Sequence, residues 1–229
     1  MSLDQKRARW FGVLFLITFA TSIPALALYE TVLRHPVSYI AGGGHDKQVL
    51  FAALLELLLI VSNIGTAVVI FPILRRQSEE LSLGYVTARI MESTFILVGI
   101  VAMLGVITLH QQVAGSAQGT VAYTLAAIKD WTFLLGPGWV VGWGNGLILG
   151  YLMYKSELVP RRMAMLGLIG GPLAFVGGVL VLMGAFDQPS PAVFAFTAIE
   201  IVWEASLALY LTFKGFRPAA PVLARQTAA

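Results

Sequence analysis

Seven side chains that ionise or form several hydrogen bonds occur inside long apolar stretches of this sequence. They are Glu56, Asn63, Arg89, Glu92, Asn145, Glu200 and Glu204. An ionisable group inside a membrane costs from a few to more than about 10 kcal/mol, so such groups usually face the interior of a helix bundle and serve a purpose. Because carboxylates accept hydrogen bonds and attract positive charge, this set could bind a cation or a polar small molecule.

The spacing of these residues places them on helix faces. Glu56 and Asn63 are seven residues apart, or two turns along one face, and Glu200 and Glu204 are one turn apart. Arg89 and Glu204 lie at similar depth from the basic ends of their segments, which predicts a charge-assisted contact between them. Glu56 lies in the opposite half and is not expected to reach Arg89.

The charges of this set do not balance. Four carboxylates accompany one arginine, which gives a net charge of −3 if all of them ionise. A low-dielectric interior holds such a charge only if carboxyl groups are protonated, hydrated or paired with a bound cation. We therefore expect a polar, partly hydrated pocket. Lys129 and Asp130 are expected outside it, at the membrane interface, where they pair with each other or with water.

The composition indicates a membrane protein. The 229 residues are 58% hydrophobic and 12% charged, with a mean hydropathy of +0.81. This charged share is about half that of a soluble domain. The sequence has no cysteine and three scattered histidines, so it predicts no disulfide, no metal site and no cofactor.

Six apolar stretches are long enough to cross the hydrocarbon core as helices. They are residues 10–28, 49–74, 83–109, 131–154, 163–186 and 193–213. The predicted fold is all-α, with residues 1–229 forming one six-helix transmembrane bundle. Residues 29–47 are expected to form a flexible external turn with Asp46 near the start of the next helix, where an acid suits the helix dipole. Residues 111–130 are expected to form an external segment that lies on the membrane.

Basic residues predict the orientation of the bundle. The two terminal segments and the loops on their side contain eleven lysines and arginines, including Arg225, whereas the opposite loops contain only Arg34 and Lys47. Both termini are therefore predicted to be cytoplasmic. Contact with anionic lipid headgroups accounts for the net charge of +3, so lipids rather than nucleic acids are the predicted partners.

Small residues predict how two of the helices pack. Residues spaced three or four apart form one such face on each helix: Gly138, Gly142, Gly146 and Gly150 on the fourth, and Gly167, Gly171, Ala174 and Gly178 on the fifth. Such faces allow helix backbones to approach closely, which predicts direct contact between these helices. The alternative is that one face contacts a second copy of the chain in a homodimer. Gly136–Pro137–Gly138 is expected to kink the fourth helix.

Several of these polar positions occur in segments that resemble a known family. The segments are LLE at 54–56, NIGTA at 63–67, FPILRRQ at 71–77, GYVTAR at 84–89, GWGNG at 142–146, LVPRR at 158–162 and WE at 203–204. Together they resemble bacterial multi-span membrane proteins described only as a domain of unknown function. The resemblance implies a location in the bacterial plasma (inner) membrane and brings no activity, cofactor or catalytic residue.

Three classes of function remain open. The leading hypothesis is a binding or transport protein whose seven polar residues line a site for a small molecule, lipid or cation, with proton coupling through Glu200 or Glu204. The alternative is a structural or regulatory membrane subunit whose buried charges only fix helix packing. The third is an intramembrane enzyme that uses Glu200 and Glu204 as acid and base. An enzyme is less favoured because no thiol, His-x-x-x-His pair or serine nucleophile elbow is present.

Overall fold

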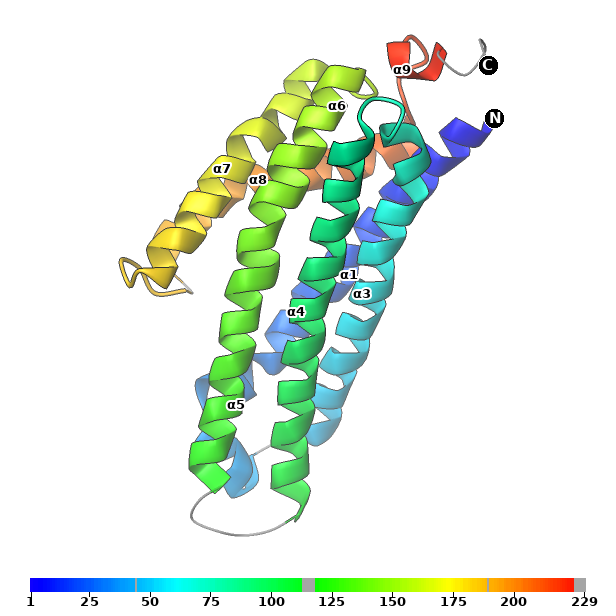
Figure 1. Cartoon of the computed structure of the whole chain (residues 1–229). Coiled ribbons are helices and arrows are strands. Elements are labelled where there is room, and N and C mark those ends of the chain that lie inside the picture. Colours follow the sequence, from blue (N-terminus) through cyan, green and yellow to red (C-terminus); the bar gives the residue numbers. More distant parts are fainter. Residues whose placement is uncertain (44, 113–117, 189, 225–229) are drawn as a thin grey trace.

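A computed structural model describes residues 1–43, 45–112, 118–188 and 190–224 as a bundle of helices without strands (Figure 1). Gly44, residues 113–117 of the expected external segment, and Arg225 lie outside the described residues. The elements, in chain order, are α1 (Leu3–Arg34), α2 (Pro36–Ser38), η1 (Tyr39–Gly43), α3 (Asp46–Leu74), α4 (Glu79–Gln112), α5 (Gln118–Phe133), η2 (Leu134–Val140), η3 (Gly142–Leu149), α6 (Gly150–Ser156), α7 (Arg161–Leu182), α8 (Pro191–Phe213) and α9 (Pro221–Ala224).

Six helical stretches are long and apolar enough to cross a membrane. Five of them are α1, α3, α4, α7 and α8, and the sixth runs from Gln118 to Ser156 through α5, η2, η3 and α6. The prediction of an all-α, six-span membrane protein is thus confirmed. The expected surface segment is wrong for residues 118–130, which form the first turns of the fourth span. Their hydropathy is low, but Ala122, Ala126 and Lys129 form a buried face at helical spacing.

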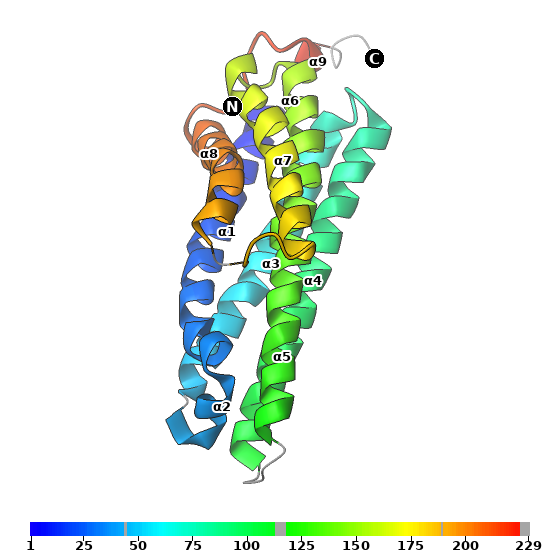
Figure 2. The same ribbon diagram turned by 90° about the vertical axis from the view of Figure 1, so that its left-hand side faces the viewer.

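The helices differ in length, and this divides the bundle into two halves. In Figures 1 and 2, α7 and α8 stop part of the way along the bundle, whereas α1, α3, α4 and the α5–α6 stretch continue beyond them. With 22 and 23 residues, α7 and α8 are each about 33 Å long, close to the thickness of a hydrocarbon core. One half of the bundle therefore has six helices and the other has four.

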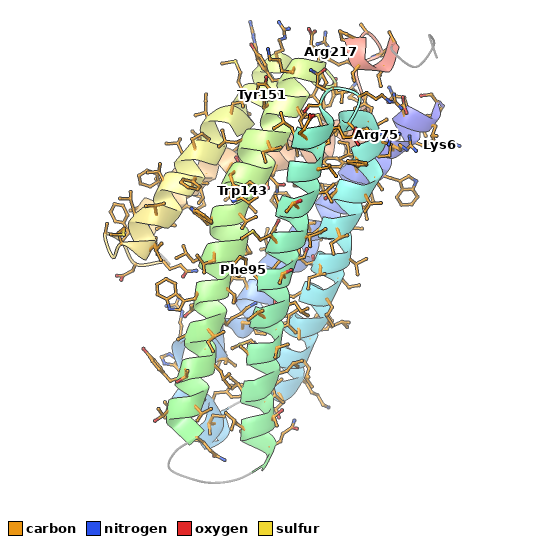
Figure 3. The ribbon with its side chains drawn as sticks, in the orientation of Figure 1. Lys6, Arg75, Phe95, Trp143, Tyr151 and Arg217 are labelled. Carbon is orange, nitrogen blue, oxygen red and sulfur yellow. The ribbon has the colours of Figure 1, made fainter. Side chains whose placement is uncertain are left out.

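The start of α1 and the last described helix, α9, both lie at the six-helix end (Figure 1). Arg76 donates hydrogen bonds to Asp4, the closer at 2.7 Å, and thereby ties α3 to α1. The side-chain amide of Gln5 donates to the carbonyl oxygen of Phe216 at 2.8 Å and accepts from its backbone N–H at 3.0 Å. Arg75 also lies at this end (Figure 3). An even number of spans requires both ends of the chain to lie on the same side of the membrane, as predicted. That this side is the cytoplasm stays a prediction.

At the far end of the bundle, three side chains contact the carboxylate of Asp46. Its carboxylate accepts hydrogen bonds from the hydroxyl of Tyr39 at 2.6 Å and from the side-chain amide of Gln111 at 2.9 Å. It also lies 2.8 Å from Nδ1 of His110. Asp46 occupies the first turn of α3, as predicted. Gly42 has a φ of 109°, in the left-handed region that favours glycine, and ends the short helical turns of the connection.

The glycine faces of the fourth and fifth spans pack on each other within one chain. A methyl group on Gly142 would lie 2.7 Å from the carbonyl oxygen of Gly171, and one on Gly150 would lie 3.2 Å from the amide nitrogen of Leu168. The predicted contact between these helices is therefore confirmed. The alternative, in which one glycine face contacts a second copy of the chain, does not apply to these faces, because they contact each other within one chain. A homodimer through another surface stays a prediction. The stretch around Pro137 forms wide π-helical turns in η2 and η3, which are frequent at functional sites.

Candidate intramembrane binding site

A cavity of about 380 Å³ lies inside the bundle and reaches from the six-helix half toward the level where α7 and α8 end. Pockets for small molecules commonly measure about 300–1,000 Å³. Six of the seven predicted residues line it: Glu56, Asn63, Arg89, Glu92, Glu200 and Glu204. They come from α3, α4 and α8, so the bundle brings side chains that are far apart in sequence to one internal surface.

Arg89 belongs to a closed network between α3 and α4. The arginine side chain is 2% exposed and donates to Glu92 at 2.8 Å. It also donates to the side-chain oxygen of Asn63, whose amide nitrogen donates to Glu92 at 3.1 Å. The ring of Phe15 on α1 lies 5.4 Å from the guanidinium carbon, within range of a cation–π contact. These three helices thus surround a single buried arginine.

Among the described residues, the predicted contact of Arg89 with Glu204 is not a hydrogen bond or an ion pair, although the two charges lie near enough to attract each other. The ion pair of Arg89 is with Glu92, one turn further along its own helix. The side chain of Glu204 instead accepts a hydrogen bond from the amide of Asn145 on η3. A residue three positions away on the same helix face is already close, so Arg89 has a partner without reaching across to α8.

Lys129 is the charged residue of the cavity wall that sequence reasoning missed. Its ammonium group lies 2.5 and 2.7 Å from the two carboxylate oxygens of Glu56, and both residues are buried. It also lies 4.9 Å from the centre of the Tyr29 ring. The expectation that Lys129 lies at the interface, paired with Asp130 or with water, is wrong, and Glu56 has a cationic partner that the sequence analysis did not assign.

The cause of this error is the early start of the fourth span. Because residues 118–130 are helical, Lys129 extends the buried face of Ala122 and Ala126, whereas Asp130 is exposed about 100° further round. The signal was available in the sequence as small residues at helical spacing before Lys129. The apolar stretch that predicts the fourth span begins at Trp131 and does not include this pattern.

Asn145 positions Glu204 and does not line the cavity itself. Its side-chain amide donates to the carboxylate of Glu204, and its backbone oxygen accepts a hydrogen bond from the indole of Trp203 at 3.0 Å. Trp203 is fully buried. The π-helical stretch η3 is therefore joined to α8 by two consecutive residues, and Glu204 is left half-buried at the cavity wall.

Glu200 has the least compensated charge in the site. The residue is 3% exposed, and neither carboxylate oxygen has a hydrogen-bond partner among the residues that the structure describes. A methyl group on Gly170 would lie 2.9 Å from one of these oxygens, and one on Gly146 would lie 2.8 Å from it. The two glycines thus provide the space that the carboxylate occupies. Burial of an ionised carboxylate without a partner is very costly, so a proton, water or a cationic group must stabilise it.

The cavity opens sideways through an apolar rim. Four lining residues are also exposed on the outer surface: Ile23 at 64%, Leu26 at 46%, Ile201 at 42% and Phe133 at 36%. Ile23 and Leu26 lie on α1, Ile201 on α8 and Phe133 on α5, inside three of the six candidate membrane-spanning stretches. The mouth of the cavity thus lies among exposed apolar side chains of membrane-spanning stretches, a surface suited to contact with lipid.

These features define a class: a multi-span helical membrane protein with an internal cavity walled by buried charges. Within the described part of the chain, no group of three or more His, Cys, Asp or Glu side chains is placed to hold a metal ion. The chain belongs to the family described as a domain of unknown function (DUF4386), whose sequence profile matches residues 10–215. This confirms the resemblance seen in the sequence. No curated protein and no solved structure matches the chain.

Proposed function

We propose that this protein binds a small molecule or lipid in its internal cavity, as part of a binding or transport function. One observation carries the proposal: the cavity of about 380 Å³ has the buried, unpartnered carboxylate of Glu200 in its wall. We place the protein in the bacterial plasma membrane, with both termini in the cytoplasm and lipid headgroups around its basic ends.

The main alternative is a structural subunit whose buried charges only fix helix packing. The pairs Arg89–Glu92 and Lys129–Glu56 suit that role, because each has its partner within the protein. A purely structural role gives no reason to bury Glu200 beside a cavity with neither oxygen bonded. Glu200 therefore favours a site that is completed by a ligand.

Proton coupling is part of the proposal. Glu200 and Glu204 are one turn apart on α8 and line the same cavity. The titratable groups near them on other helices include Tyr85, Arg89 and Glu92 on α4, and the Glu56–Lys129 pair between α3 and α5. Since the charged groups among these pair with one another, a proton and a positively charged ligand would compete for the two carboxylates of α8.

Filling the cavity tests the proposal. Ala174 on α7 lines the cavity and is buried, whereas Val176 on the same helix is exposed and lies outside the lining. Native mass spectrometry of gently solubilised protein would compare the wild type with Ala174→Phe and Val176→Phe. We expect a defined adduct on the wild type and on Val176→Phe, and its loss from monodisperse Ala174→Phe.

Two outcomes would contradict this proposal. Adducts of equal mass and occupancy in all three proteins would place the bound molecule outside the cavity. A wild type without any adduct, together with an Ala174→Phe variant at least as stable as the wild type, would support the structural role. Ala174→Leu serves as a second, smaller filling variant if the phenylalanine variant does not fold.

A further inference from the structure

We infer that the ligand of this cavity is an amphipathic organic cation whose charged group docks at Glu200 and Glu204, and whose apolar part lies toward the lateral mouth. The inference rests on the proposed function, because it assigns a chemical class to the same cavity. It follows from the charges of the wall, the shape around Glu200 and the position of the mouth.

The charges of the wall favour a cation over an anion. Four carboxylates and two cations line the cavity, which gives a net charge of −2 if all six ionise. The cations are engaged, since Lys129 contacts both carboxylate oxygens of Glu56, and Arg89 contacts Glu92 and Asn63. Apart from the buried Nε of Arg89, which has no hydrogen-bond partner among the described residues, an anionic ligand would have to displace one of these protein partners, at the cost of leaving another buried charge unpaired.

The two remaining carboxylates are suited to an ammonium group. Glu200 has no hydrogen-bond partner, and Glu204 accepts from the neutral amide of Asn145 without an ion pair, among the residues that are described. Ionised carboxylates only accept hydrogen bonds, whereas an ammonium group donates three. Because side chains one turn apart on a helix are neighbours, one ammonium group can bond both carboxylates. Gly146 and Gly170 leave room for the Glu200 carboxylate, which occupies the space that side chains at these two positions would fill.

The rest of the cavity suits an apolar body. Aromatic and aliphatic side chains from α1, α3 and α4 complete the wall, among them Phe19, Leu59 and Ile96. The mouth between Ile23 on α1 and Ile201 on α8 continues this surface to the lipid-facing exterior. A molecule that partitions into the bilayer would therefore reach the carboxylates without crossing a polar barrier. In the proposed orientation, α1 passes the mouth in the half of the membrane away from the cytoplasm.

The test uses two probes of equal chain length and opposite charge, decylammonium and decanoate. Full-length protein is placed in phosphatidylglycerol nanodiscs, and binding is measured by titration calorimetry with subtraction of empty nanodiscs. We expect saturable binding of decylammonium and weaker binding of decanoate. Glu200→Gln should weaken decylammonium binding about 30-fold, because it removes the protein's partner from a buried charge pair. Glu30→Gln, which changes an exposed carboxylate on α1, should bind as the wild type does.

A second pair of variants tests the route. Ile201→Trp narrows the mouth, whereas Val202→Trp adds the same bulk at an exposed position that does not line the cavity. Only Ile201→Trp should slow or abolish decylammonium binding.

Nanodiscs that contain phosphatidylethanolamine distinguish the two sources of an ammonium group. Competition by this lipid would support a lipid headgroup as the natural ligand, and undiminished binding would support a free amphipathic amine.

The results separate failure of this inference from failure of the proposed function. Decylammonium binding that is unchanged in both Glu200→Gln and Glu204→Gln would overturn the inference, as would tighter binding of decanoate. If decanoate binding is sensitive to Ile201→Trp, the cavity still binds ligands and only the cationic class is wrong. If neither probe binds saturably and native mass spectrometry finds no cavity adduct, both proposals fail. Glu204→Gln replaces Glu200→Gln if the latter is not monodisperse.

Discussion

Lys129 and Glu56 form a bidentate ion pair, with the ammonium nitrogen 2.5 Å and 2.7 Å from the two carboxylate oxygens, across a sequence separation of 73 residues. The pair joins α5 to α3 at the wall of the cavity. Because both side chains are almost fully buried, each ion depends on the other for compensation of its lost hydration.

Removal of one member of this pair should destabilise the protein more than removal of both. We expect Lys129→Met alone to lower the free energy of unfolding by about 3–5 kcal/mol, because it leaves Glu56 buried without its cation. The double variant Lys129→Met/Glu56→Gln should lose less than Lys129→Met alone, and so less than the sum of the single losses. Unfolding by steric trapping in bilayers would measure all three. Additive losses would contradict the pairing, and Lys47→Met, at an exposed lysine, is the control.

Asn63 should contribute to stability through the hydrogen bonds that it makes to both Arg89 and Glu92. Asn63→Leu keeps a similar volume but removes one acceptor from the guanidinium and one donor from the carboxylate. A loss of about 1–3 kcal/mol in the free energy of unfolding is expected, since buried polar groups lose their partners. The exposed neighbour Val61, changed to Leu, should have little effect. Equal stability of the two variants would show that the network contributes nothing.

The close contact between η3 and α7 should make Gly142 intolerant of any side chain. A methyl group there would lie 2.7 Å from the carbonyl oxygen of Gly171 and 2.9 Å from the amide nitrogen of Phe175, and backbone atoms cannot rotate away. We expect Gly142→Ala to cost about 1–3 kcal/mol through overpacking. Gly84→Ala meets only the end of the Ile148 side chain at 3.4 Å and should be tolerated. Thermal unfolding of both variants in one nanodisc preparation checks this difference.

The orientation of the bundle can be tested without background labelling because the sequence has no cysteine. In intact bacterial cells, a membrane-impermeant maleimide should label Lys47→Cys, which is exposed at the start of α3. Lys6→Cys, near the N-terminus on α1, should react only after the cells are permeabilised. The reverse pattern would show that the positive-inside rule assigns the wrong orientation to this protein.

The sequence alone was sufficient to predict the six spans, the four carboxylates inside them that line the cavity and the buried arginine, but not the buried Lys129. Both predictions depend on local composition, because the apolar length of a segment and the cost of a charge within it can be read from that segment alone. Glycine spacing likewise predicted the contact that Gly142 makes with Gly171, since both helices present small residues at regular intervals. Six of the seven predicted polar residues line one cavity for the same reason: each had to avoid lipid.

Only the tertiary structure decided which charged side chains pair with each other and which one has no partner. Arg89 pairs with Glu92 and not with Glu204, and Lys129 neutralises Glu56 from a helix that starts earlier than its hydropathy indicates. Helix spacing defines a face, but the helix opposite that face depends on how the whole bundle packs. The unpartnered carboxylate of Glu200 and the lateral mouth therefore follow from contacts between segments far apart in the chain, which no local pattern records.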